Sequence, residues 1–184
     1  MYIPKINLAT DRKEMVSFMK RFSFATVITA KDNFPIATHL PFLVTEKDDT
    51  LVLRSHFARA NDQWKDIENH KVLVIFSEPH AYISPTHYDN EINVPTWNYS
   101  AVHIYGTVKI LEESDAIQSL KTLVDKYEAA SKNPVRIEEL SKKTMMQVRG
   151  IVAFEIAIDE IQAVHKMSQN RDEKNYGNII TELE

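Results

Sequence analysis

The chain has 184 residues, a mass of 21.3 kDa and a formal net charge of -4 at pH 7. This length suits one hydrophobic core, and 43% apolar with 26% charged residues is ordinary for a folded protein. The negative charge excludes the broad positive field that drives sequence-independent binding to nucleic acid. The chain contains no cysteine, which excludes disulfides, thiolate nucleophiles and cysteine-held metal clusters. No run reaches the roughly 18 apolar residues that span a bilayer, and residues 1–13 lack the apolar core of a secretion signal, so we expect a cytoplasmic protein without a membrane partner.

The N-terminal part predicts a helix followed by a β-hairpin. Thr10 or Asp11 can cap a helix whose apolar side chains recur at helical spacing, which favours packing against a sheet. Residues 24–30 are rich in β-branched residues, and after a polar turn residues 35–45 are predicted to form one extended strand. The apolar stripe of the helix consists of Met15, Phe18, Met19 and Phe22.

The middle of the chain predicts more strands and one short helix. A strand at 51–56 leads into a helix over the segment ARANDQWKDI, which begins at residue 58. Two strands at 71–77 and 80–84 are predicted with a turn between them at Glu78-Pro79. A long polar loop at 85–95 then leads into the longest predicted strand, at 96–111. On that strand Val102, Ile104 and Gly106 share one face, and His103, Tyr105 and Thr107 share the other.

The C-terminal part predicts two helices, a strand and a last helix. Residues 114–130 and 134–148 look helical, so residues 114–148 form an insertion or appendage. Residues 150–158 return to a strand, and the last helix is expected to break or fray near Gly177. Six or seven strands without regular alternation of strand and helix predict a mainly β or α+β fold, a small antiparallel barrel, in a single domain over residues 1–184.

Three polar clusters are candidates for a binding site. The usual glycine-rich phosphate loops and the zinc-protease and hydrolase motifs are missing, and the chain has only three glycines. The first cluster lies where the strand at 51–56 meets the following helix, whose free N–H groups favour an anion. It consists of Ser55, His56, Arg59 and Asn61. The alternative interpretation is a helix cap with ordinary surface groups.

The second cluster offers flat ring faces and hydrogen-bonding groups that suit a planar cofactor. Its members are Trp97 and Tyr99, with Thr96, Asn98 and His103 beside them. The alternative is that the aromatic residues belong to the core or to an interface.

The third cluster is a dense polar run after an apolar strand. Its two cations suit a phosphate or an electron-rich ring, and the alternative is a turn in which Asn170 or Asp172 caps the last helix. The run contains Lys166, Ser168, Gln169, Asn170 and Arg171.

The seven histidines form no metal-binding pattern. His80, His87 and His103 share neither a helical i, i+4 spacing nor a short metal-knuckle spacing, so we expect no metal site. Basic residues between 132 and 149 alternate with Glu138 and Glu139, which is typical of a solvated helix.

In their order and in their amino-acid sequences, these clusters resemble the PaiB-like family of FMN-binding negative transcriptional regulators. The chain departs from the family at Asp62, where proline is common, at Thr86-His87, where Ser-Trp is common, and at Met167, where leucine is common. The matching pieces are HLPF at 39–42, HFARANDQW at 56–64, AYISPTHY at 81–88, VPTWNYSAVHIYG at 94–106 and KMSQNR at 166–171.

The resemblance implies a split β-barrel of the pyridoxamine-phosphate-oxidase-like class, usually a homodimer with FMN between the subunits. Carried onto this sequence, the first cluster would lie near the phosphate and ribityl chain. The ring system would lie near Trp97, Asn98 and Tyr99. The remaining site residues, from the same or the partner subunit, would be Lys166, Ser168, Gln169 and Arg171.

The resemblance also implies a repressor, for example of sporulation or secreted protease production. The sequence shows no helix-turn-helix motif and its net charge is negative, so direct DNA binding lacks support from the sequence. One alternative is a flavin-dependent oxidoreductase or flavin reductase, for which no catalytic residue is assigned. A third possibility is a haem-binding protein with His39, His87 or His103 as the axial ligand.

Overall fold

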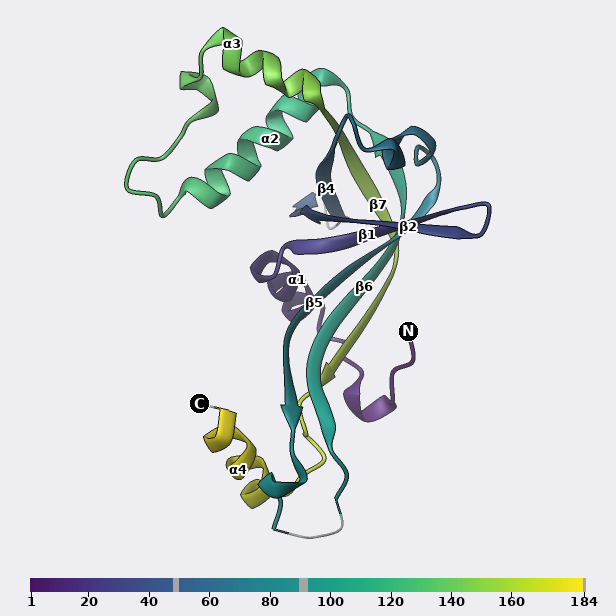
Figure 1. The fold of residues 1–184 in the computed structure, drawn as a ribbon, viewed down its shortest axis with the longest axis vertical. Coiled ribbons are helices and arrows are strands. Elements are labelled where there is room, and N and C mark those ends of the chain that lie inside the picture. The colour runs from purple at the N-terminus through teal and green to yellow at the C-terminus, as the bar shows by residue number, and fades with distance from the viewer. Residues whose placement is uncertain (48–49, 90–92, 184) are drawn as a thin grey trace. The chain divides into compact units, whose positions relative to one another are not determined.

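The computed structural model describes residues 1–47, 50–89 and 93–183. Within these residues seven strands form one sheet, in the order β2-β1-β5-β6-β7-β4-β3 (Figure 1). The order is open, with β2 and β3 at its two ends. The strand number and the α+β class agree with the sequence prediction. The strands are β1 (Phe24–Lys31), β2 (Phe34–Pro41), β3 (Leu43–Lys47), β4 (Thr50–Ala58), β5 (Lys71–Ile83), β6 (Thr96–Ile110) and β7 (Ile151–Lys166).

The described part of the chain contains four α-helices and several short 3-10 helices. None of these helices is long and apolar enough to cross a membrane. The α-helices are α1 (Arg12–Arg21), α2 (Glu113–Glu128), α3 (Lys142–Met145) and α4 (Glu173–Leu183).

The chain divides into two compact units. Unit 1 comprises Met1–Phe22, Ile75–His103 and Ile161–Glu184, and unit 2 comprises Ser23–Val74 and Ile104–Glu160. Strands β5, β6 and β7 contribute residues to both units.

In unit 1, α1 begins at the predicted cap. The Asp11 carboxylate accepts hydrogen bonds from the backbone N–H groups of Lys13 and Glu14, at 2.7 and 3.1 Å. Helix α1 buries Val16 and Met19. At the other end of the chain, α4 packs Ile179 against Ile83 and Tyr88, which forms a small apolar cluster.

In unit 2, β1 and β2 form the predicted hairpin. Their register runs from Phe24 opposite Pro41 to Lys31 opposite Phe34. The two turn residues, Asp32 and Asn33, have φ of 52° and 63°, the left-handed conformation that two-residue hairpin turns require. The core of this unit contains Phe42, Phe57 and Phe154, and the ring centroids of the last two are 4.9 Å apart.

Two predicted strand boundaries are wrong. The expected strand at 35–45 is two strands, β2 and β3, separated at Phe42, whose backbone N–H donates to the carbonyl of Ser23. The expected turn at Glu78-Pro79 is absent, because β5 continues through both residues. Part of the loop predicted at 85–95 lies outside the described residues.

Three predicted helices differ from the observed ones. The segment 134–148 forms only α3 and flanking 3-10 turns, because Pro134 disfavours helical backbone in the residue before it and Val135 bonds to the Glu128 carboxylate instead. Helix α4 runs through Gly177 without a break. The helix expected from residue 58 is a 3-10 helix of five residues, Asp62–Asp66.

Candidate functional site

The first predicted cluster lies in unit 2, where the side chains of Ser55, Arg59 and Asn61 form hydrogen bonds within the protein. Ser55 is buried and its hydroxyl donates to the carbonyl of Pro41 at 2.7 Å. The Asn61 side-chain oxygen accepts from the backbone N–H of Gln63 at 3.0 Å, and its Nδ2 donates to Thr38 Oγ1 at 2.9 Å. Asn61 therefore caps the 3-10 helix, and one of the N–H groups expected to face an anion is occupied.

Arg59 precedes this 3-10 helix and is held by backbone carbonyls. Its Nε donates to the carbonyl of Arg149 at 2.7 Å and its Nη2 to that of Ile151 at 3.0 Å. The guanidinium carbon lies 5.7 Å from the ring centroid of Trp64, whose indole N–H donates to the Arg59 carbonyl at 2.9 Å. These residues line a cavity of about 410 Å³. Through these hydrogen bonds the Arg59 guanidinium holds the start of β7 against the end of β4.

The remaining member, His56, is a half-buried residue of β4. Burial lowers the pKa of His56 below 6.5, which favours the neutral imidazole. It stands next to Ser55 on a regular strand, so the two side chains leave opposite faces.

Sequence reasoning missed the most connected polar side chain of this region. Gln63 is 5% exposed, and its Nε2 donates to Thr29 Oγ1 and to the carbonyl of Ile36, both at 3.1 Å. Its Oε1 accepts from Thr38 Oγ1 at 2.6 Å. Nothing in the spacing of the segment ANDQW marks this glutamine as buried. The network joins the 3-10 helix to the β1–β2 hairpin.

The second cluster lies on β6, and strand geometry divides it between two faces. Asn98 is buried, whereas Trp97 is 53% exposed and Tyr99 is half-buried. Neighbouring side chains on a strand alternate, so Trp97 and Asn98 do not meet on one surface. Trp97 contacts His80 and Tyr82, at ring-centroid distances of 6.0 and 5.8 Å. We call His80, Tyr82 and Trp97 the aromatic cluster.

The third cluster meets Asn98 in unit 1 and forms a tight turn. Ser168 has a φ of 59°, and its hydroxyl donates to the buried Asn98 Oδ1 at 3.0 Å. The Gln169 side chain donates to the carbonyls of Ile6 and His165, at 3.0 and 2.7 Å, and accepts from the Met167 N–H at 2.7 Å. Ser168 and Gln169 therefore fix the backbone of the turn.

The two cations of this cluster, by contrast, line a cavity of about 290 Å³. Lys166 Nζ donates to Thr96 Oγ1, and Arg171 Nη1 donates to Asn93 Oδ1 at 2.9 Å. The Arg171 guanidinium also lies 4.3 Å from the ring centroid of Tyr88. Both cations are half-buried, and neither forms an ion pair with a carboxylate among the described residues. We call this space the cation cavity.

At its end this turn leads into α4 through a helix cap, the alternative that the sequence analysis gave for the segment. Asp172 accepts hydrogen bonds from the backbone N–H and the side-chain amide of Asn175, at 2.9 and 2.7 Å. These bonds lower the pKa of the Asp172 carboxyl below 3.8. Asp172 therefore caps α4, as one of the two residues predicted for that role.

The histidines considered as haem ligands lie in different units. In unit 2, His39 stacks on Phe24 with ring centroids 6.3 Å apart. In unit 1, the Nδ1 atoms of His87 and His103 are buried without a hydrogen-bond partner among the described residues. Burial and the N-terminal ammonium of Met1 lower the pKa of His103 below 6.5. No group of three metal-binding side chains occurs in the described part of the chain.

Residues 1–160 match a protein family described as "Putative FMN-binding domain". The whole chain is 45% identical over 186 residues to "Protease synthase and sporulation protein PAI 2" of Bacillus subtilis (strain 168), of which it covers 89%. The third cluster lies beyond the family match but inside the part that aligns with this relative.

Two solved structures resemble the fold. The FAD and heme binding protein from Mycobacterium smegmatis is 16% identical with a TM-score of 0.68, over 95% of this chain and 80% of that one. The flavocytochrome Anf3 from Azotobacter vinelandii is 14% identical with a TM-score of 0.69, over 96% of this chain and 78% of that one. At such identities these likenesses show the fold alone, and with the open seven-stranded sheet they confirm the predicted split-barrel α+β fold. The full-length identity and the family match establish that the chain belongs to the FMN-binding family of PaiB-like proteins, as its motifs predicted.

Proposed function

We propose that the protein binds FMN, with the phosphate of the cofactor in the cation cavity. The observation that carries this proposal is the pair of half-buried cations, Lys166 and Arg171, which line one cavity without a carboxylate partner among the described residues. A dianionic phosphate would balance both charges, and a guanidinium can donate two parallel hydrogen bonds to it. The hydroxyl of Thr96 lies in the same cavity and adds a hydrogen-bonding group.

Ser168, Gln169 and Asn98 would act indirectly in this arrangement. Their hydrogen bonds hold the turn in which Lys166 and Arg171 stand five residues apart. A turn fixed in this way lowers the entropic cost of placing both cations on one anion. We assign Ser55, Arg59 and Asn61 to folding rather than to the cofactor, because their hydrogen bonds join separate segments of unit 2 to one another.

We propose further that the flavin ring lies between two copies of the chain. The aromatic cluster exposes about half of Tyr82 and of Trp97, at 49% and 53%. It leaves the opposite face of β6 from Asn98, so in a homodimer the cluster of one copy could cover a ring held by the other. Stacking on exposed aromatic faces would stabilise both the ring and the dimer.

Bound flavin would supply electron transfer, which the side chains of this chain cannot supply alone. We propose a regulatory role in protease production and sporulation, in keeping with the name of the relative from Bacillus subtilis. The net charge of -4 favours indirect regulation over direct DNA contact. A flavin-dependent oxidoreductase is the alternative, and oxidation of NADPH by the FMN-loaded protein would favour it.

The test is a titration of the protein with FMN, followed by flavin fluorescence. The double variant Lys166→Ala, Arg171→Ala should weaken binding at least about a hundredfold, because two charge-assisted hydrogen-bonding groups are lost at roughly 1.5–3 kcal/mol each. The matched control is Lys142→Ala, Lys143→Ala, which removes the same charge from exposed positions on α3 and should bind normally. Equal affinity of the wild type and the first variant would contradict the assignment of the cation cavity.

The same samples test the remaining parts of the proposal. Arg59→Ala should bind FMN within about twofold of the wild type once its folding is checked by circular dichroism. Light scattering should give the mass of a dimer, and Trp97→Ala should weaken both the dimer and FMN binding. A Soret band on titration with haem, in place of FMN binding, would support the haem alternative.

A further inference from the structure

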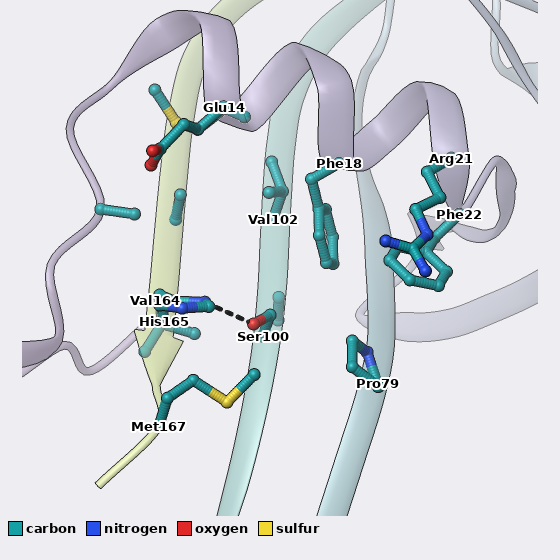
Figure 2. A pocket seen from close by; sticks show the side chains of 14 residues that line it. Glu14, Phe18, Arg21, Phe22, Pro79, Ser100, Val102, Val164, His165 and Met167 are labelled. Atoms are coloured by element: carbon teal, nitrogen blue, oxygen red, sulfur yellow. Dashed lines mark hydrogen bonds between the residues drawn. The ribbon is translucent and has the colours of Figure 1, made fainter. Parts of the chain in front are cut away.

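A second cavity, of about 400 Å³, lies in unit 1 between α1 and the strands beneath it (Figure 2). Met15 and Phe18 of helix α1 form its roof together with Phe22, which directly follows the helix, and residues of β6 and β7 form its floor. We call it the α1 cavity. None of the residues proposed to hold FMN lines it.

Small residues on one side and half-buried apolar residues on the other border the α1 cavity. The residues of its floor include the small residues Ser100, Ala101 and Ala163. Above them Met15 and Phe18 are only half-buried, although they belong to the apolar stripe of the helix. The space is open to solvent, since Glu14, Arg21 and His165 on its lining are exposed, so a ligand can enter it. Its volume falls in the range of roughly 300–1,000 Å³ typical of small-molecule sites.

Two polar features lie within this mostly apolar space. Ser100 is only 4% exposed, and its hydroxyl is 2.7 Å from Nδ1 of His165. The second feature is the Arg21 guanidinium, which lies 5.1 Å from the ring centroid of Phe22. Arg21 has no hydrogen bond or ion pair with any of the described residues. The Ser100–His165 pair and a cation without an anionic partner both face the same volume.

The α1 cavity has a negative charge at one end and a positive charge at the other. Figure 2 shows the Glu14 carboxylate and the Arg21 guanidinium at opposite ends, with the Phe18 ring between them. Arg21 follows Glu14 by seven positions, which places the two residues about two helical turns apart on one face. An anionic group would be attracted at the Arg21 end and repelled at the Glu14 end.

We infer that the α1 cavity binds a small aromatic anion. Its apolar rings would lie against Met15 and Phe18, its anionic group would bind Arg21, and the Ser100–His165 pair would offer a hydrogen bond from the floor. This inference is independent of the proposed flavin site. At the end of β7, His165 and Met167 line the α1 cavity, whereas Lys166 and Ser168 line the cation cavity.

The probe for this test is anilinonaphthalene sulfonate, an aromatic anion whose fluorescence rises in apolar surroundings. The folded protein should bind one equivalent per chain. Arg21→Gln should weaken binding about five- to tenfold, since a single charge-assisted contact at the rim is lost, and Phe18→Ala should weaken it similarly. Lys13→Gln removes the same charge from an exposed position on α1 outside the cavity and should leave binding unchanged. Thermal melts of each variant exclude binding to unfolded chains.

Competition with FMN separates this inference from the proposed function. Binding of the probe should persist in FMN-saturated protein and in the Lys166→Ala, Arg171→Ala variant. Displacement of the probe by FMN would mean that the α1 cavity belongs to the flavin site and would overturn the inference. Equal binding by wild type, Arg21→Gln and Phe18→Ala, or no binding at all, would overturn it as well.

Discussion

Replacing Gln63 by leucine tests whether the buried amide network holds unit 2 together. The substitution keeps a side chain of similar size but removes the hydrogen bonds to Thr29, Ile36 and Thr38 and a longer one, of 3.5 Å, to the carbonyl of Val27. At a net value of about 1 kcal/mol per bond, the loss should be about 2–3 kcal/mol, because Thr38 keeps its bond from Asn61. For a chain of this size, that corresponds to a fall in Tm of roughly 4–12 °C.

The measurement is urea unfolding followed by circular dichroism, with scanning calorimetry for the Tm. The matched control is Gln118→Leu, which changes an exposed glutamine on α2 and should alter the free energy of unfolding by less than about 0.5 kcal/mol. A Gln63→Leu variant as stable as the control would refute the reasoning, since the network would then contribute nothing to folding.

Three further predictions concern single positions. A Cβ on Gly106 would lie 2.5 Å from the carbonyl oxygen of Ala157, so Gly106→Ala should lower the free energy of unfolding by about 1–3 kcal/mol in urea titrations. Because the pKa of His56 is lowered in the folded state, unfolded chains take up more protons below pH 6.5. Stability should therefore fall as pH drops through 6.5, and less steeply in His56→Gln. The lowered pKa of Asp172 means that its cap on α4 persists above about pH 3.8 and is lost as pH falls through the folded value. Asp172→Ala should speed amide exchange at Asn175 at neutral pH, as measured by NMR.

Periodicity was sufficient to predict most elements of the fold. The cap at Asp11, the hairpin at residues 24–41 and the alternation on β6 follow from rules that act within a few residues. Two of the failures lie at prolines, where the spacing of apolar residues does not determine the path of the backbone. Strand β5 continues through Pro79, although proline usually interrupts a strand. Around Pro134 the helical spacing of apolar residues persists, but the backbone departs from the helix.

The candidate site shows a different limit. The sequence located the turn at 166–171, but it could not separate the two cations from the residues that shape the turn, because all are polar. Only the positive φ of Ser168 and the hydrogen bonds of Gln169 distinguish these roles. The α1 cavity left no signal in the sequence, because small floor residues such as Ala101 and Ala163 look like ordinary strand positions.

Arg59 illustrates why a motif does not assign a role. It stands in the segment HFARANDQW, one of the pieces that carry the family resemblance, and a cation there suggests a phosphate ligand. In the structure both of its donating nitrogens bond to backbone carbonyls, and its flat face lies over Trp64. These bonds use two of the five N–H groups of the guanidinium and fix its orientation, so a phosphate would have to approach the remaining N–H groups from the side that this orientation leaves open. Among the described residues, Lys166 and Arg171 donate to side chains, the Thr96 hydroxyl and the Asn93 amide oxygen, and not to backbone carbonyls or a carboxylate, so an anion can bind them without taking a donor from the backbone.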